Sequence, residues 1–331
     1  MNKKKLLTIF IPTYNRANCL KECIYSVIYS SKGYLDKVQI VVSDDGSTDN
    51  SRKIVETIIK KYSFIIYKKN KKNLYTDLHF SKLIQSTKTE YYWLLGDDDK
   101  ITKNAIREII KFIDLGYGLI YLNYSIWTKD FRNLLFKNGL GIDKDIKFVN
   151  HNKLIEKIGF NMGYISSVIA KKSFFTDISS KERKLYFGYT MPQFYPLYKS
   201  QINSCNALLV SKCYLNNRSG NNSEKHWFKI FIEGSDIFFN ALFNIGYKKK
   251  SILIAQKKVI IDYLIPHILQ LKIHSDVNLK LCFYLFRYVK KFIFLYLFIV
   301  FIILLPKSII ISRKDFFHQL QFKIKKTYGT I

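Results

Sequence analysis

Three consecutive aspartates, Asp97, Asp98 and Asp99, are the residues of this sequence best suited to chemistry. They follow Gly96 and an apolar run at 91–95 that predicts a buried strand. Adjacent carboxylates repel one another, so a chain keeps three together mainly where a positive charge balances them. Mg²⁺ and Mn²⁺ take carboxylate oxygens and share their coordination shell with phosphate. A solvated turn is the alternative, because Gly-Asp-Asp is ordinary turn chemistry.

Strands that alternate with helices are expected to position this acidic turn. Apolar runs at 6–11, 38–42, 64–67 and 91–95 predict four strands. Amphipathic patterns at 20–28, 54–59, 77–86 and 105–113 predict the helices between and after them, with Thr102 as the N-cap of the last. This alternation predicts an α/β fold with a doubly wound, mostly parallel sheet.

Ligands of such sheets bind beyond the carboxyl ends of the strands. The rule brings three separate segments to one edge: the loop at 12–16, the pair Asp44 and Asp45, and the turn at 97–99. Two acidic turns beside a loop that offers Tyr14, Asn15 and Arg16 predict a site for a nucleoside diphosphate and a cation.

The same three segments closely resemble those of the family 2 glycosyltransferases, which have the GT-A fold. They read Pro-Thr-Tyr-Asn-Arg at 12–16, Val-Val-Ser-Asp-Asp-Gly-Ser-Thr-Asp at 41–49, and Asp-Asp-Asp at 97–99. The Gly-Asp-Asp-Asp form at 96–99 and Tyr-Ile-Ser-Ser-Val-Ile at 164–169 look like the abequosyltransferase-type branch, which builds bacterial surface polysaccharide. The resemblance is strong over roughly residues 5–125, weaker to about 225 and absent beyond.

The resemblance implies transfer of a sugar from a nucleotide-sugar donor to a saccharide acceptor in capsule or O-antigen synthesis. Asp98 and Asp99 would hold the Mn²⁺ or Mg²⁺ that bridges the diphosphate. Tyr14 would stack on the base, Asp45 would accept a hydrogen bond from the base edge, and Asp97 would either assist or face solvent. The full nucleotide-binding set is Pro12, Tyr14, Arg16, Asp44, Asp45 and Asp97.

Three positions depart from the family pattern. Gly96 replaces a frequent Asp, and Tyr75 replaces an expected glycine. Inverting members deprotonate the acceptor hydroxyl with a carboxylate that would fall at 189–193, which reads Tyr-Thr-Met-Pro-Gln and contains no acid. The catalytic base is therefore unknown. Candidates on charge alone, each of which is also compatible with an ordinary surface role, are Glu182, His226, Glu233 and Asp236.

A formal net charge of +29 requires an anionic partner, either nucleic acid or a membrane surface. Lys290 and Lys291 precede 14 apolar residues at 292–305, fewer than the ~20 that span a bilayer. The basic flanks favour an interfacial or re-entrant segment over a buried core helix. Long helical patterns from residue 227 predict a membrane-associating region at 226–331 after a glycosyltransferase domain at 1–225.

The expected partners are the nucleotide sugar, a polyprenyl-diphosphate-linked saccharide and an anionic membrane, and not nucleic acid. In the less regular part before residue 226, Arg218 either closes over the pyrophosphate or lies in a plain surface loop.

The N-terminal sequence and the cysteines bear on the location of the protein and on metal or disulfide sites. The apolar run after the basic N-terminus is too short for a signal peptide, so we expect a peripheral or monotopic protein on the cytoplasmic face of the plasma membrane. The five cysteines form no CxxC pair, and so predict neither a disulfide framework nor a zinc site. Three alternatives stay open: a nucleic-acid-binding protein, a nucleotidyltransferase without a glycine-rich triphosphate loop, and a non-catalytic GT-A relative.

Overall fold

A computed structural model of the protein describes residues 5–179, 181–183, 193–220, 229–274 and 279–313. Contacts divide the chain into two units, residues 1–151 with 162–223 and residues 152–161 with 224–331. The segment 152–161 thus joins the second unit. The predicted boundary at 225 had placed this segment in the first domain. We describe each unit separately.

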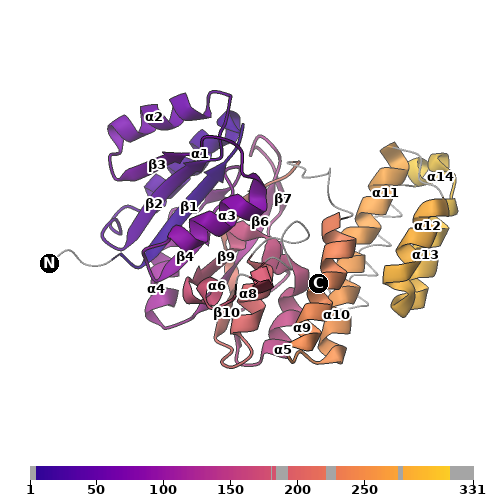
Figure 1. The fold of residues 1–331 in the computed structure, drawn as a ribbon. Coiled ribbons are helices and arrows are strands. Elements are labelled where there is room, and N and C mark those ends of the chain that lie inside the picture. The colour runs from indigo at the N-terminus through magenta and orange to yellow at the C-terminus, as the bar shows by residue number, and fades with distance from the viewer. Residues whose placement is uncertain (1–4, 180, 184–192, 221–228, 275–278, 314–331) are drawn as a thin grey trace. The chain divides into compact units, whose positions relative to one another are not determined.

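One ten-stranded sheet forms the centre of the first unit (Figure 1). Its order is β3-β2-β1-β4-β9-β6-β10-β5, while β7 pairs with β6 and β8 pairs with β10. The strands are β1 (Leu7–Thr13), β2 (Val38–Asp44), β3 (Ile65–Lys69), β4 (Tyr91–Leu94), β5 (Lys100–Ile101), β6 (Leu119–Trp127), β7 (Leu134–Phe136), β8 (Ile146–Phe148), β9 (Val168–Lys171) and β10 (Ala207–Arg218).

The sheet is parallel in its first half and mixed in its second. Strands β3, β2, β1 and β4 pair in parallel, as the alternation of strands and helices predicted. Strand β9 then runs antiparallel to both β4 and β6. A short 3₁₀ turn, Ile165–Ser167, leads into this strand.

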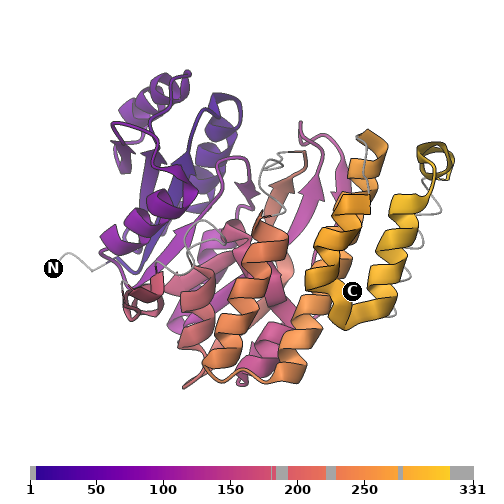
Figure 2. The same cartoon turned by 45° about the vertical axis from the view of Figure 1, so that its right-hand side comes forward.

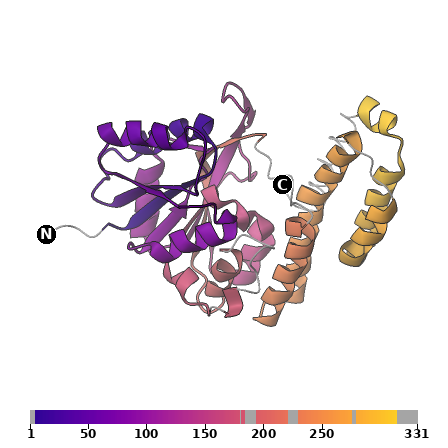
Figure 3. The ribbon, with the colours of Figure 1, turned by 45° about the horizontal axis from the view of Figure 1, so that its top comes forward.

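Helices cover both faces of the parallel half (Figure 3). Leu7, Ile9 and Ile11 of β1 join one core cluster with side chains of α1, α2 and α4, whereas α3 contacts β1 and α6 instead. Helix α4 begins after Asn104, so the predicted N-cap Thr102 was wrong. The helices are α1 (Ala17–Ser30), α2 (Ser51–Lys61), α3 (Tyr75–Ser86), α4 (Ala105–Asp114), α6 (Ser173–Thr176) and α8 (Phe194–Ser200).

The second unit is helical (Figure 2). The segment at 152–161 belongs to it because the Phe160 ring packs on Phe231, Phe238 and Tyr263. Its elements are α5 (His151–Ile158), the 3₁₀ helix Gly159–Gly163, the π-helix Lys229–Gly234, α9 (Ser235–Asn244), α10 (Lys249–Val259), the π-helix Ile260–Leu264, α11 (Ile265–His274), α12 (Leu279–Val289), the 3₁₀ turn Lys290–Phe292, α13 (Ile293–Leu304) and α14 (Lys307–Ser312). Elements α5 and Gly159–Gly163 each extend into the first unit at one end.

The apolar C-terminal stretch forms the second arm of a helical hairpin, α13, which packs against α12. Helices α12 and α13 are separated at Lys290–Phe292, and the Tyr296 hydroxyl donates to the Cys282 carbonyl at 3.3 Å. The break falls at two exposed lysines, whose ammonium groups remain in water. Within the described residues, no helix has both the length and the apolar character needed to cross a membrane.

Helix α13 provides a test of which of its apolar faces supports the fold. Ile299 is fully buried in the core of the helical unit, whereas Leu297 on the same helix is 54% exposed. Ile299→Ala should lower the free energy of unfolding by about 2–5 kcal/mol because it leaves a cavity. Leu297→Ala should change it by less than about 0.5 kcal/mol. Urea unfolding of the two variants measures the difference, and equal losses would contradict this assignment of the faces.

Candidate active site

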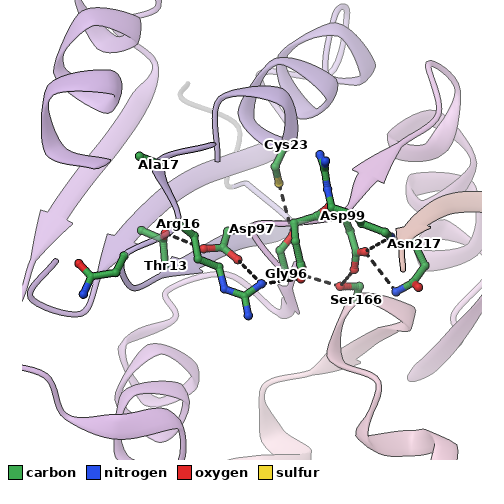
Figure 4. A network of polar contacts seen from close by, with 12 residues as sticks. Thr13, Arg16, Ala17, Cys23, Gly96, Asp97, Asp99, Ser166 and Asn217 are labelled. Atoms are coloured by element: carbon green, nitrogen blue, oxygen red, sulfur yellow. Dashed lines mark hydrogen bonds and ion pairs between the residues drawn. The ribbon is translucent and has the colours of Figure 1, made fainter. Parts of the chain in front are cut away.

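The loop after β1 and the turn after β4 meet at the carboxyl edge of the parallel half, as predicted. The Leu95 amide donates to the Phe10 carbonyl at 2.8 Å, which continues the pairing of β4 with β1. Beyond it, the Thr13 hydroxyl donates to Asp97 Oδ2 at 2.6 Å (Figure 4). Residues more than eighty positions apart in sequence are thereby joined at one site.

Arg16 supplies a positive charge to this acidic turn. Its Nη1 donates to Asp98 Oδ2 at 2.6 Å and lies 3.8 Å from Asp97 Oδ1. Burial raises the pKa of Asp97 to about 7, against the opposing effects of the Thr13 hydrogen bond and the Arg16 charge. Asp97 is 6% exposed, so it belongs to the interior of the site and does not face solvent.

Asp99 is enclosed by hydrogen-bond donors on both oxygens. Oδ2 accepts from the Ser166 hydroxyl at 2.6 Å and from the Tyr164 hydroxyl at 2.9 Å. Oδ1 accepts from Asn217 Nδ2 and from the Arg218 amide, each at 3.3 Å. Burial, with the charge of Asp98, raises the pKa of Asp99 to about 7 despite these bonds. A carboxylate with about four lone-pair directions is largely satisfied by such a shell.

Ser166 connects this shell to the backbone of the turn. Its hydroxyl accepts from the Gly96 amide at 2.9 Å, and its carbonyl accepts from the Trp93 indole at 2.7 Å. A Cβ at Gly96 would lie 2.9 Å from Asp98 Oδ1 and 3.1 Å from Ser166 Oγ. A side chain at position 96 would therefore require Asp98 or Ser166 to shift, which favours glycine over the frequent Asp of the family pattern.

Arg218 is a buried support of the acidic turn. Its Nε donates to the Asp98 carbonyl at 3.0 Å, its Nη2 pairs with Glu22 at 2.6 Å, and its Nη1 donates to the Lys129 carbonyl. The guanidinium carbon lies 4.3 Å from the centroid of the Phe131 ring. Protein groups therefore surround the Arg218 side chain. This differs from both expectations, which were closure over a pyrophosphate and a position in a plain surface loop.

The predicted base-binding pocket contains both exposed and buried groups. Tyr14 is 44% exposed, so its ring is accessible for stacking. Asp44 is fully buried, where it accepts from the Ser47 amide and the Tyr67 hydroxyl, each at 2.6 Å. It therefore shapes the turn rather than presenting an oxygen at the surface. Pro12 is also buried, as a β1 residue paired with Ser43 of β2.

Asp45 lies against the loop that follows β3. Its Oδ1 accepts from Asn70 Nδ2 at 2.8 Å and from the Leu74 amide at 3.1 Å. His79 Nδ1 is 3.8 Å from Asp45 Oδ2, and burial lowers the pKa of this histidine, which sequence spacing did not single out. Tyr75 has a φ of +61°, the left-handed conformation that explains why a glycine is expected there.

The candidates for the catalytic base lie in different parts of the chain. The hydrogen bond from Lys199, at 2.5 Å, lowers the pKa of Glu182 to about 2, so this carboxylate is a weak base near neutral pH. Glu233 and Asp236 belong to the helical unit, where they accept from Tyr284 and Asn240. His226 and residues 189–192 lie outside the described residues.

The donor chemistry of the turn fits a hard divalent cation. A Cβ placed at Gly96 would lie 2.9 Å from Asp98 Oδ1 and 3.3 Å from Asp99 Oδ2, so an oxygen of each carboxylate lies close to this glycine. In the described part of the chain, no group of three or more His, Cys, Asp or Glu residues is arranged to hold a metal ion. The protein would thus supply one or two carboxylates, with phosphate and water completing the shell, which is the usual arrangement for Mg²⁺.

Substitution of two adjacent serines tests whether the Ser166 hydroxyl stabilises the acidic turn. Ser166→Ala removes a hydroxyl that bridges the Gly96 amide and Asp99, and should destabilise the protein by about 1–3 kcal/mol. Ser167 is the matched control, because its buried hydroxyl has no hydrogen-bond partner among the residues that the structure describes. Ser167→Ala should be neutral or slightly stabilising in thermal unfolding. A loss for Ser167→Ala as large as that for Ser166→Ala would refute the special role of Ser166.

Comparison with known proteins agrees with this geometry. The sequence profile described as glycosyl transferase family 2 matches residues 8–171. The abequosyltransferase RfbV of Salmonella typhimurium is 31% identical over 179 residues, which cover 50% of this chain and 53% of that protein. A Campylobacter jejuni protein named GalNAc(5)-diNAcBac-PP-undecaprenol beta-1,3-glucosyltransferase is 25% identical over 57% of this chain and 61% of its own length. The chain thus spans little more than half the length of these two relatives.

A solved structure confirms the fold. Residues 1–349 of S. aureus TarS superpose with a TM-score of 0.59 at 16% identity, over 78% of this chain and 72% of that one. This likeness bears on architecture alone and confirms the expected GT-A fold. The family profile covers β1, β2, β4 and the acidic turn within residues 8–171: this chain carries a family 2 glycosyltransferase domain.

Proposed function

We propose that the protein transfers a sugar from a nucleotide-sugar donor to a lipid-linked saccharide in bacterial surface-polysaccharide synthesis, with a divalent cation. The observation that carries this proposal is the convergence of the loop at 12–16, the Asp44–Asp45 turn and the Asp97–Asp99 turn on one sheet edge. Two relatives are named as an abequosyltransferase and a glucosyltransferase, and the name of the second includes an undecaprenol-linked saccharide.

The residues of this edge divide into those that meet the donor and those that support them. Tyr14 stacks on the base, and Arg16 is suited to the diphosphate because guanidinium groups bind phosphate bidentately. Asp98 is the carboxylate best placed to hold Mn²⁺ or Mg²⁺, since its side chain is 20% exposed whereas Asp99 is enclosed by donors. When bound, the cation would stabilise the negative charge of the departing nucleoside diphosphate.

Asp99 and Asp44 act mainly by positioning in this proposal. Asp99 fixes the turn through Ser166, Tyr164 and Asn217, so its oxygens hold Asp98 in place. Asp44 fixes the neighbouring turn through the Ser47 amide. The acceptor hydroxyl must also lose its proton, and we leave the base unassigned because Glu182 is too acidic for that role.

The helical unit supports contact with an anionic membrane surface. The segment 279–313 carries six Lys and Arg residues and no Asp or Glu. On α13, side chains spaced three and four residues apart are more than half exposed, while the opposite face packs in the core. These exposed residues are Phe294, Leu297, Phe301 and Leu304. An apolar helical face flanked by lysines suits the interface of the cytoplasmic leaflet.

The acidic turn makes the central mutational prediction. Asp98→Asn should lower kcat/KM for the nucleotide sugar by about 100-fold or more and abolish the effect of Mn²⁺ on donor binding. Asp114→Asn is the control, since Asp114 is a 53% exposed carboxylate paired with Lys37. Radiolabelled sugar transfer with and without EDTA measures both. Full activity of Asp98→Asn in EDTA would contradict the metal role, and a wild-type protein that transfers no sugar would favour a non-catalytic relative.

The exposed face of α13 makes a second prediction. The double variant Phe294→Ser and Phe301→Ser should bind phosphatidylglycerol vesicles about tenfold more weakly, because two aromatic side chains no longer enter the interface. Phe243→Ser on α9, which removes a 52% exposed ring from the same unit, should leave vesicle binding unchanged. Co-sedimentation at increasing salt measures the binding. Retained vesicle affinity in the double variant, or salt-sensitive binding to DNA in place of vesicles, would refute the membrane assignment.

A further inference from the structure

We propose that Arg16 and the divalent cation compete for Asp98 and that a nucleotide diphosphate relieves this competition, so that the cation and the diphosphate each promote binding of the other. The inference rests on the proposed function, because it concerns the same acidic turn. It assigns Arg16 two successive partners, the carboxylates before binding and the diphosphate afterwards.

The ion pair between Arg16 and Asp98 is the first observation. The two side chains approach to 2.6 Å, while Asp97 lies 3.8 Å from the same nitrogen. In the described part of the chain, these two aspartates are the recorded partners of the Arg16 guanidinium. Its side chain is 39% exposed, so it can leave without opening the core.

Arg218, the other arginine that contacts the acidic turn, is buried and held in place by several partners. Its side chain is 7% exposed and is bound by Glu22 and by the carbonyls of Asp98 and Lys129. Moving it would leave several buried groups without partners, which is costly. Of the two arginines that contact the turn, Arg16 is therefore the one able to move.

A cation and Arg16 compete for Asp98. The Arg16 guanidinium, 2.6 Å from Asp98 Oδ2, already balances the charge of this carboxylate, and its positive charge would repel a cation held by the same group. A diphosphate offers Arg16 a new bidentate anionic partner and offers the cation further oxygen ligands. It thus removes the competitor and completes the coordination shell. Because binding linkage is reciprocal, the cation must raise diphosphate affinity by the same factor.

The test measures binding of Mn²⁺ alone, by electron paramagnetic resonance of the free ion, with the full-length protein and no nucleotide. Arg16→Gln should bind Mn²⁺ about tenfold more tightly than wild type, since it removes a charge-assisted hydrogen bond to Asp98. Arg16→Met provides a second neutral variant with the same expected direction. Arg52→Gln is the control, because Arg52 pairs with Glu56 on α2 and is 63% exposed. Adding Asp98→Asn to Arg16→Gln should remove the gain.

A second arm measures coupling by titrating UDP, CDP, GDP and dTDP with and without Mn²⁺. The factor by which Mn²⁺ raises diphosphate affinity should be smaller in Arg16→Gln than in wild type. If folded Arg16→Gln and Arg16→Met bind Mn²⁺ no better than wild type, while wild type binds Mn²⁺ with a diphosphate through Asp98, the inference is wrong and the proposed function survives. If wild type binds no Mn²⁺ with any of the four diphosphates, the proposed metal dependence itself fails.

Discussion

Repulsion among three carboxylates at the end of one buried strand is the constraint on which the rest of the site depends. Asp97 and Asp99 are almost fully buried, and burial raises the pKa of each to about 7. Such groups stay together only where donors and positive charges compensate them. The molecule supplies Thr13 and Arg16 on one side of the turn and Ser166, Tyr164 and Asn217 on the other.

The mixed topology of the sheet explains where these donors come from. Its parallel half delivers Thr13 and Arg16, because β1 lies beside β4 in register. Its second half delivers the others, because Ser166 precedes the antiparallel strand β9 and Asn217 is the penultimate residue of β10. Arg218 then joins this second half to Glu22 of α1. The site is therefore a junction of the two halves, with a side chain from each bound to the same turn.

The sequence predicted the parts of this arrangement that follow from local pattern. Periodicity located the four parallel strands, and the rule for parallel sheets brought the three motif segments to one edge. Ser166 was visible only as part of a motif at 164–169, and Asn217 carried no signal, because its contact with Asp99 depends on pairing between distant strands. Charge alone also misjudged Glu182, whose pairing with Lys199 makes it too acidic.

The sequence pattern also could not predict the tertiary contacts of individual side chains. Asp44 and Asp45 read alike in sequence and both are buried, but Asp44 accepts from its own turn and from Tyr67 of β3, whereas Asp45 accepts from the loop after β3. The apolar stretch at 292–305 likewise did not reveal that one face of α13 packs in a core and the other is exposed. Both distinctions arise from tertiary contacts rather than from residue type.

The most direct test of the account is thermal unfolding of the wild-type protein with UDP-, CDP-, GDP- and dTDP-sugars, each with Mn²⁺ and with EDTA. A ligand at about 100 times its Kd should stabilise the folded state by about 2.7 kcal/mol. We expect at least one nucleotide sugar to raise the melting temperature by several degrees with Mn²⁺, and by much less in EDTA. An equal rise in EDTA, or no rise with any of the four donor classes in Mn²⁺, would contradict the claim that the acidic edge binds a nucleotide sugar through a divalent cation.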